Sequence, residues 1–414
     1  MHDEIKNNLN DPKMLEKLYR ENKSQFKKAF KIVFPDIQHS PIAQIWHERL
    51  FYETQEISTG TRKEMLVVAL LAIIAGIIAK IPDFTHINAD FFYPRNIAFI
   101  VFPMLSVYFA WKQKLGYRKI LFLAVVILLS VVYINILPER ELSDTLILAY
   151  IHMPLFMWAV AGFAFAGQQP RSFSIRLEYL RFNGELVVLG ALILIAGGIL
   201  SAVTIGLFEL INIRIEDFYM SNIAIWGLAA APVLGTHLVR QNPQLVGYVS
   251  PLVAKIFSPL VLFMVVIYLI AIVYTGKNPY TDRDFLILFN FLLIGVMAII
   301  LFSVSGSTKT STAKWHTMML FALSIVTILV NGIALSAIVF RITEWGFTPN
   351  RLAVLGANLL MITNLVVVAF QLFKTLKFKD ELVGVENSIA FFLPVYAVWA
   401  FLVTFIFPLL FNFQ

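Results

Sequence analysis

Long apolar stretches recur along the chain after residue 62. A helix needs about 20 predominantly apolar residues to cross the hydrocarbon core of a bilayer. Eleven stretches approach or exceed this length, and each predicts one membrane-spanning helix. Their approximate ranges are 64–81, 95–111, 119–137, 144–167, 184–212, 219–239, 256–275, 284–305, 315–340, 350–373 and 387–411. The pattern therefore predicts an all-α, polytopic membrane protein whose transmembrane helical bundle occupies residues 63–414.

Residues 1–62 are mostly polar, and their apolar positions are spaced by three, four and seven. Asp11 with Pro12 is typical of a helix start, Pro35 of a helix end, and Ser40 before the next proline of a second start. The apolar stripe of the first helix consists of Leu15, Leu18, Tyr19, Phe26, Ala29, Phe30 and Val33. We therefore predict a cytoplasmic amphipathic helical hairpin over residues 1–62, which either contacts anionic lipid headgroups or packs on the bundle.

Composition supports a membrane protein. Hydrophobic residues make up 59% of the 414 residues, charged residues only 14%, and the mean hydropathy is +0.76. The net charge of +7 would suggest nucleic acid in a soluble protein, but the basic residues here lie where a membrane topology needs them, so no nucleic-acid partner is expected. The absence of cysteine excludes a disulfide, a thiolate metal site and a cysteine nucleophile.

Loop charge predicts the orientation of the spans. The loops on one side of the predicted bundle carry 13 basic residues and those on the other side only 8. The basic side is expected to be cytoplasmic, and an odd number of spans then places the N-terminus inside and the C-terminus outside. The 13 residues are Lys112, Lys114, Arg118, Lys119, Arg171, Arg176, Arg181, Arg240, Lys309, Lys314, Lys374, Lys377 and Lys379.

Polar residues within the predicted spans gather in the outer half of the membrane once each span is oriented. Buried ionisable and amide groups often face the interior of a helical bundle or a wet cavity. We therefore predict an outward-facing polar cavity, although amides in membrane helices also simply bond neighbouring helices. The candidate cavity residues are His152, Glu209, Asn290, Asn331 and Asn358.

His152 has the most specific sequence context among these residues. Pro154 frees the carbonyl of Tyr150 from its helical hydrogen bond and can leave a wet notch beside the imidazole. His152 can then relay protons or bind an anionic group, or it can remain neutral and donate to a carbonyl or amide. Glu209 can bind a cation or pair with His152, or it can reach water from the end of its helix.

The predicted outer loop 341–351 has the densest set of charged and aromatic residues. Arg341 and Arg351 flank Glu344, and guanidinium pairs suit the phosphate or carboxylate groups of a lipid or glycan carrier. These three residues are therefore candidate anion contacts. Alternatively, Glu344 pairs with one arginine while Trp345 anchors a tight turn at Gly346 in the headgroup region.

Motifs of soluble catalysis are missing from the sequence. It contains no Walker loop, no His-Glu-x-x-His, no Gly-x-Ser-x-Gly and no Cys-x-x-Cys, so neither a cofactor nor a metal ion nor a set of catalytic residues is predicted. Transport or lipid handling is the favoured function. The alternatives are a membrane-embedded enzyme acting on a lipid-linked substrate, which we favour less, and a structural or sensory partner subunit.

Four stretches resemble a family of bacterial multi-pass inner-membrane proteins known only as a domain of unknown function, in the form found in Bacteroidetes. They are Ile-His-Met-Pro-Leu-Phe-Met-Trp over 151–158, Leu-Arg-Phe-Asn-Gly-Glu over 180–185, Pro-Leu-Val-Leu over 259–262, and the whole of 341–351. In the family the last motif usually reads Tyr-Gly-Leu-Thr, where this chain has Trp345 and Phe347. The resemblance implies a bacterial inner membrane and assigns no activity or catalytic residues.

Overall fold

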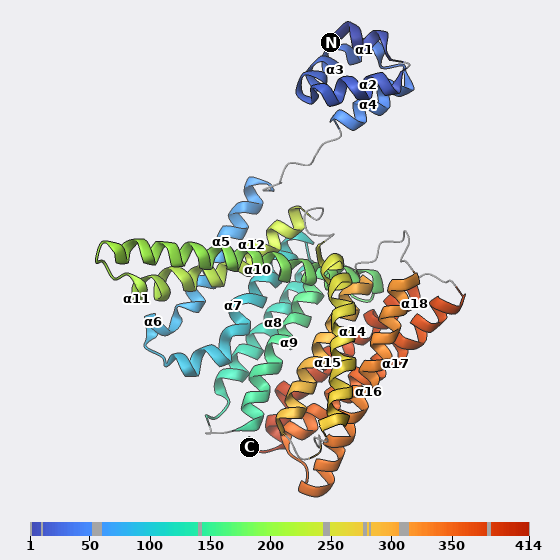
Figure 1. Ribbon diagram of the computed structural model, residues 1–414. Helices are drawn as coiled ribbons and strands as arrows, with labels where there is room; N and C mark the ends of the chain where they lie inside the picture. The colour runs from blue at the N-terminus through green and yellow to red at the C-terminus, as the bar shows by residue number, and fades with distance from the viewer. Residues whose placement is uncertain are drawn as a thin grey trace. The chain divides into compact units, whose positions relative to one another are not determined.

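The computed structural model describes residues 2–9, 11–51, 60–139, 143–242, 249–275, 280, 283–305, 314–378 and 382–413. Within these ranges the regular structure is helical and contains no strand. The chain divides into two compact units, Met1–Ser58 and Thr59–Gln414, where the sequence analysis placed its boundary after residue 62. Figure 1 shows the helices of both units. Lys309 and Lys379, which we counted among the cytoplasmic basic residues, lie outside the described residues.

The N-terminal unit contains four helices in its described part rather than the predicted two-helix hairpin. The long first helix that we predicted is interrupted at Asn22, whose side chain accepts a hydrogen bond from the Gln25 amide and so caps a new helix. Pro35 lies inside that helix, which continues to Ile37. The helices are α1 (His2–Asn7), α2 (Pro12–Glu21), α3 (Lys23–Ile37) and α4 (Pro41–Phe51).

This break changes what the apolar stripe does. Because α2 and α3 fold back on each other, most of the stripe packs inside the unit itself, together with Trp46 from α4. Phe26 and Phe30 are completely buried there. The unit therefore has its own small hydrophobic core instead of a continuous apolar face for a membrane or a bundle.

Every predicted apolar stretch lies in helices of the second unit. These are α5 (Arg62–Ala79), α6 (Ile81–Thr85), α7 (Ala89–Lys112), α8 (Tyr117–Ile136), α9 (Asp144–Ala166), α10 (Phe173–Leu210), α11 (Glu216–Phe218), the π-helix η1 (Tyr219–Ala224), α12 (Ile225–Gln241), α14 (Val249–Thr275), α15 (Arg283–Ser305), α16 (Lys314–Trp345), α17 (Pro349–Phe378), α18 (Val383–Phe401), the π-helix η2 (Leu402–Ile406) and α19 (Phe407–Leu410).

Seven continuous helical segments among the described residues are long and apolar enough to cross a membrane. They are α8, α9, α10, the run Glu216–Gln241, α16, α17 and the run Val383–Leu410. These segments indicate a membrane protein. The remaining predicted spans correspond to the helices α5, α7, α14 and α15. In α14 and α15 the described residues contain the shorter apolar stretches Ile256–Ile267 and Leu292–Val304. In α5, three of the 18 residues are the charged residues Arg62, Lys63 and Glu64.

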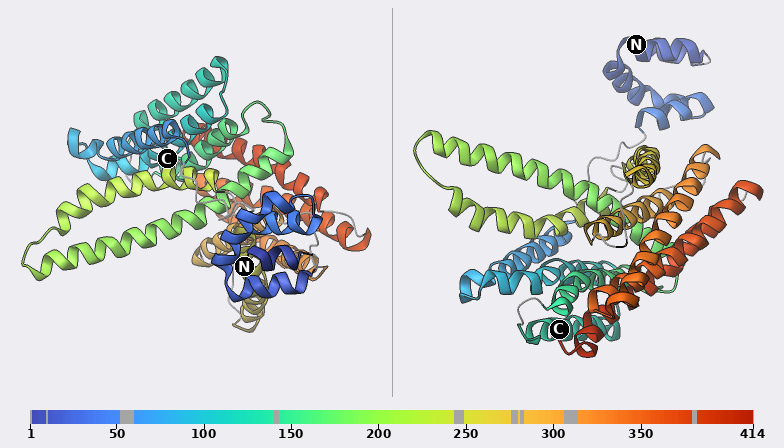
Figure 2. Two further views of the ribbon diagram at one scale, coloured as in Figure 1. Left: turned by 90° about the horizontal axis from the view of Figure 1, so that it is seen from above. Right: turned by 60° about the horizontal axis from the view of Figure 1, so that its bottom comes forward.

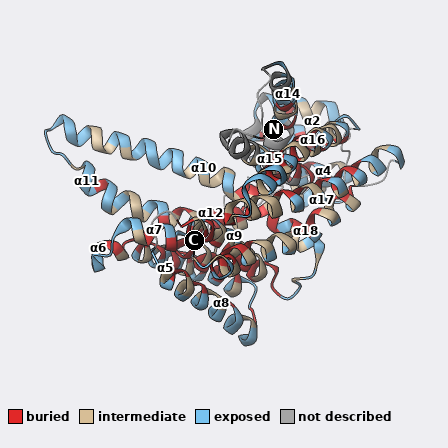
Figure 3. Ribbon diagram, turned by 90° about the horizontal axis from the view of Figure 1, so that it is seen from below, coloured by how far each residue is buried: buried red, intermediate tan, exposed pale blue. Residues whose placement is uncertain are grey.

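Helix α10 differs from its prediction in where it begins. We expected a span from residue 184, whereas the helix already begins at Phe173 and is 38 residues long. Its buried residues all lie between Leu177 and Glu185, and its apolar C-terminal half is exposed. Figures 1 and 2 show this half projecting beside α12 as a helical hairpin, and Figure 3 shows its exposed surface.

The second unit contains two large clusters of buried apolar side chains. One is built mainly by α5, α7, α8, α9 and α12, and the other by α14 to α18. The ring of Trp158 on α9 is partly buried and packs against both clusters. The C-terminal segment from α18 to α19 packs along α9, and its Val403 and Phe407 form a smaller third cluster with Leu148 of α9 and Ala353 of α17.

Candidate functional site

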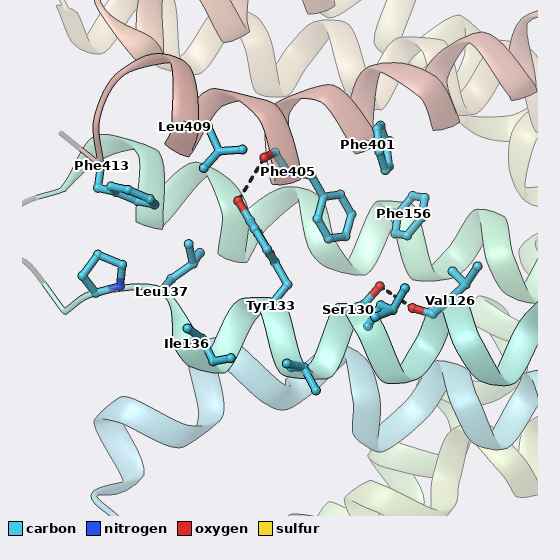
Figure 4. A pocket seen from close by; sticks show the side chains of 13 residues that line it. Val126, Ser130, Tyr133, Ile136, Leu137, Phe156, Phe401, Phe405, Leu409 and Phe413 are labelled. Atoms are coloured by element: carbon cyan, nitrogen blue, oxygen red, sulfur yellow. Dashed lines mark hydrogen bonds between the residues drawn. The ribbon is translucent and has the colours of Figure 1, made fainter.

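A cavity of about 570 Å³ lies between α8, α9 and the C-terminal segment of the chain (Figure 4). Five aromatic rings and several aliphatic side chains form almost all of its lining. This volume is within the range of about 300–1,000 Å³ that is usual for small-molecule sites. The lining residues are Val126, Leu129, Ser130, Val132, Tyr133, Ile136, Leu137, Pro138, Phe156, Phe401, Phe405, Leu409 and Phe413.

The few polar groups in this lining are already hydrogen-bonded to the backbone. The Tyr133 hydroxyl donates to the Phe405 carbonyl at 3.0 Å, and the Ser130 hydroxyl donates to the Val126 carbonyl at 2.8 Å. Phe405 belongs to η2, and such π-helical segments occur frequently at functional sites. The cavity therefore offers an apolar surface and little to a polar solute.

The cavity follows α8 from Val126 to its C-terminal end. Eleven residues of helix separate Val126 from Leu137, which corresponds to about 16 Å, or roughly half of a hydrocarbon core. Its rim includes Ile136 and Leu409, which are 73% and 59% exposed. Helix faces of this kind would contact lipid in a membrane, so the cavity is open to the side of the bundle.

A buried arginine lies next to the end of this cavity that is formed by the C-terminal end of α8. Arg95 on α7 is 1% exposed, and its Nη1 donates to the Tyr150 hydroxyl. Its Nη2 donates at 3.4 Å to the main-chain oxygen of Leu137, whose residue also lines the cavity. The guanidinium stacks on Phe91, with 4.0 Å between its carbon and the ring centre. Among the described residues, no carboxylate forms an ion pair with it.

Three of the predicted cavity residues do come together. Asn358 on α17 donates from Nδ2 to Oδ1 of Asn290 on α15 at 3.0 Å, and Asn331 on α16 donates to the main-chain oxygen of Asn358 at 3.2 Å. Asn331 and Asn358 are fully buried, and the Oδ1 atom of each has no hydrogen-bond partner. The asparagines therefore link three helices and leave two acceptor atoms unsatisfied.

His152 and Glu209 are not joined to this cluster by any hydrogen bond or ion pair in the described part of the chain. His152 is half-buried on α9, and its Nδ1 lies 2.8 Å from the main-chain oxygen of Leu148, one turn earlier. Glu209 is exposed near the C-terminal end of α10. His152 therefore matches the alternative in which the imidazole is bonded to a carbonyl. Glu209 matches the alternative in which the carboxylate reaches water from the end of its helix.

The outer-loop residues stabilise the turn between α16 and α17. Arg351 donates from Nη1 to the main-chain oxygens of Trp345 and Gly346 at 2.9 and 2.7 Å, and Arg341 donates from Nε to the Tyr280 oxygen at 3.1 Å. Both guanidinium groups lie near the Trp345 ring. Gly346 has a φ of +76°, which favours glycine at this turn. Glu344 is exposed and, in contrast to the alternative we considered, has no arginine partner among the described residues.

Sequence reasoning missed a buried charged group where α5, α7 and α12 meet. The Glu64 carboxylate is 3% exposed and accepts hydrogen bonds from Tyr108 at 2.9 Å and from Lys112 at 2.7 Å. Nδ1 of His237 lies 3.7 Å from it. A Cβ atom at Gly60 would lie only 3.1 Å from Glu64 Oε2, so the backbone approaches closely. These groups form a compact ion-pair network.

Arg95 was missed for a related reason. The predicted span begins at residue 95, so the sequence placed Arg95, which follows Pro94, at the very edge of an apolar stretch and among the eight basic residues of the less basic side. The helix instead begins at Ala89 and continues through the proline, so Arg95 lies within it. An arginine followed by a nearly unbroken apolar run is the sequence signal that could have indicated burial.

No family model, curated protein or solved structure matches this chain. Within the described residues, no group of three or more His, Cys, Asp or Glu side chains is placed to hold a metal ion. The function must therefore be inferred from the geometry of the sites themselves.

Proposed function

We propose that this protein handles lipid, and that the cavity between α8, α9 and the C-terminal segment binds the hydrocarbon chain of a lipid-like molecule. The observation that carries the proposal is an aromatic-lined cavity of about 570 Å³ with an exposed apolar rim. Removing a hydrocarbon chain from lipid gains little by itself, so close packing against the aromatic rings is the expected source of selectivity.

The membrane topology that we propose places this cavity in one leaflet. It consists of the eleven predicted spans, with the N-terminus in the cytoplasm and the C-terminus outside, in a bacterial inner membrane as the family resemblance implies. Seven apolar segments support it, and the loop charges support its direction. In this orientation the C-terminal end of α8 faces outward, and the cavity extends over about half of the hydrocarbon core. The occupant would then be a chain of the outer leaflet.

The contacts favour lipid handling over the other predicted functions. A transporter of polar solutes needs a polar lining, whereas the polar groups of this cavity are already bonded to the backbone. An enzyme acting on a lipid-linked substrate needs free groups at the outer surface, whereas Arg351 and His152 are engaged with main-chain oxygens. In the N-terminal unit most apolar side chains pack in its own core, although Ile32 and Ile45 are exposed, so contact with anionic headgroups would depend mainly on its lysines.

Photo-crosslinking in nanodiscs tests this proposal. A long-chain alcohol with a diazirine in its chain should label peptides of α8 and of the segment that contains Phe405, and Val126→Phe should reduce that labelling at least severalfold by filling the cavity. Val125→Phe is the matched control, because Val125 is the preceding residue of α8 and its own side chain is exposed and does not line the cavity. Equal labelling of both variants, or labelling spread evenly over the exposed helices, would refute the proposal.

A further inference from the structure

Arg95 is a buried charge that forms no ion pair with the described carboxylates. Its neighbours supply a hydroxyl, a main-chain oxygen and two aromatic rings, but no ion-paired carboxylate in the described residues. A buried cation without a counter-charge is costly in a protein and more so in a membrane. Its Nε is buried and has no hydrogen-bond partner. Among the described residues, the guanidinium therefore has hydrogen-bonding capacity left for a negatively charged group.

The unfilled donors lie on one edge of the guanidinium. Nε and Nη2 form a planar fork that matches the two oxygens of a carboxylate or phosphate. Here Nε has no partner and Nη2 has only a 3.4 Å contact with a neutral carbonyl, which is at the long end of the hydrogen-bond range. The Tyr150 hydroxyl and the Phe91 ring meanwhile hold the rest of the group in place. The Nε and Nη2 donors are thus held in a fixed orientation, but only Nη2 has a hydrogen-bond partner, and that bond is long.

The position of this fork connects it to the lipid cavity. Leu137 contributes its side chain to the cavity and its main-chain oxygen to Nη2 of Arg95. A molecule whose chain lies along α8 would therefore end close to the guanidinium. Displacing the long contact with Leu137 by a charged oxygen would replace a weak neutral hydrogen bond with a charge-assisted pair.

We propose that the ligand of the cavity carries an anionic head, a carboxylate or a phosphate, which binds the Nε and Nη2 edge of Arg95. This inference rests on the proposed function, because it identifies the head of the same molecule whose chain fills the cavity. Glu139 is a described acidic residue that interacts electrostatically with Tyr150, the hydrogen-bond partner of Arg95, and it is exposed. Its negative charge disfavours a second anion only weakly from solvent.

Two probes with the same diazirine-labelled chain, one an alcohol and the other its phosphate monoester, distinguish binding of the chain from binding of the head. In full-length protein in nanodiscs, the phosphate should label the cavity at a concentration about tenfold lower than the alcohol, as expected for a charge-assisted pair. Arg95→Gln should remove this preference while leaving the alcohol unaffected. Arg95→Lys keeps the charge without the fork and should retain only part of the preference. Arg214→Gln is the control, because Arg214 is exposed between α10 and α11 and does not line the cavity, and it should leave the preference unchanged.

The outcomes distinguish the two proposals. If neither probe labels the cavity, the proposed function itself is wrong and the inference fails with it. If both probes label it equally, or if Arg95→Gln and Arg95→Lys leave the preference intact, the cavity stands and the anionic head is refuted. Inorganic phosphate added in large excess should not displace the phosphate monoester, and displacement would show that the fork binds a free anion rather than a lipid head.

Discussion

The two ends of α7 bury opposite charges in different ways. Near the C-terminal end of the helix, Lys112 and Tyr108 both donate to the buried carboxylate of Glu64. Near the other end, Arg95 is buried without a carboxylate partner among the described residues, and its Nε atom has no hydrogen bond. Seventeen residues separate Arg95 from Lys112, or about 25 Å of helix.

This difference separates structural charges from candidate functional ones. A buried ion pair with complete hydrogen bonding is self-contained, and removing one partner leaves an expensive isolated charge. A buried charge that lacks its counterpart has already incurred that cost, so removing it should be tolerated. Burial alone therefore does not identify a binding site in this protein, whereas incomplete pairing does.

The largest effect is expected from Lys112→Met. It leaves the Glu64 carboxylate, which is 5% exposed at its side chain, without its charged partner, and should destabilise the protein by about 3 kcal/mol. The free energy of unfolding can be followed by titrating mixed micelles with a denaturing detergent. Lys114→Met is the control, because Lys114 is exposed in the turn just after α7 and its replacement should change stability little. Equal effects of the two substitutions would show that the Glu64 network does not contribute to stability.

Asn358→Leu tests whether a neutral buried polar group behaves as the charges do. It removes the donor to Asn290 but keeps the main-chain oxygen that Asn331 uses. Because side-chain hydrogen bonds in membrane proteins contribute little on average, we expect a loss of about 1 kcal/mol in the same unfolding assay. A loss as large as that of Lys112→Met would contradict the view that charge, rather than burial, dominates.

Arg95→Met should have a smaller effect when no ligand is present. It removes two hydrogen bonds and a ring contact but also a buried charge that forms no ion pair with the described carboxylates, so the change in unfolding free energy should be less than about 1 kcal/mol in either direction. Delipidated protein in detergent is the right sample for this measurement. A loss comparable with Lys112→Met would instead make Arg95 a structural residue.

The smallest effect is expected for an ion pair in the N-terminal unit, between the guanidinium of Arg20 and the carboxylate of Glu16. The Arg20 side chain, with Arg49 also close by, lowers the pKa of the Glu16 carboxyl below its ordinary value of 4.5. The stabilisation that the ionised Glu16 carboxylate gives the folded unit is therefore present above pH 4.5 and is lost as the pH falls through the lowered pKa. Hydrogen exchange of α2 should become slightly faster on acidification, after correction for intrinsic rates, and Glu16→Gln should remove that change. An unchanged pH response in Glu16→Gln would rule out this pair as its cause.

Much of the secondary structure could be predicted from local sequence. Every apolar stretch lies in helices, and Pro349 begins α17 as its position after Thr348 suggested. The break at Asn22 was missed because the apolar spacing continues across it, although a capping asparagine is a local signal. The early start of α10 was missed because its first turns are polar enough to resemble a loop.

The candidate sites were less predictable. Loop charges predicted a similar depth for five polar residues, and three of these, the asparagines of α15, α16 and α17, do meet. Depth does not specify the rotation of a helix about its axis or the identity of its neighbours, so His152 could not be assigned a partner in advance. The aromatic cavity escaped notice because its residues are ordinary apolar positions on three separate segments.

Hydrophobicity and loop charge are properties of short segments, so the sequence alone was enough to predict helices, a membrane location and a direction of insertion. Pairing depends on contacts between residues far apart in the chain. Only the tertiary structure decided that Glu64 pairs with Lys112, that Arg95 is bonded to a hydroxyl and a main-chain oxygen, and that the C-terminal segment lines an apolar cavity next to that arginine. The physical reason is that a partner is specified by how helices pack and rotate, which no local pattern encodes.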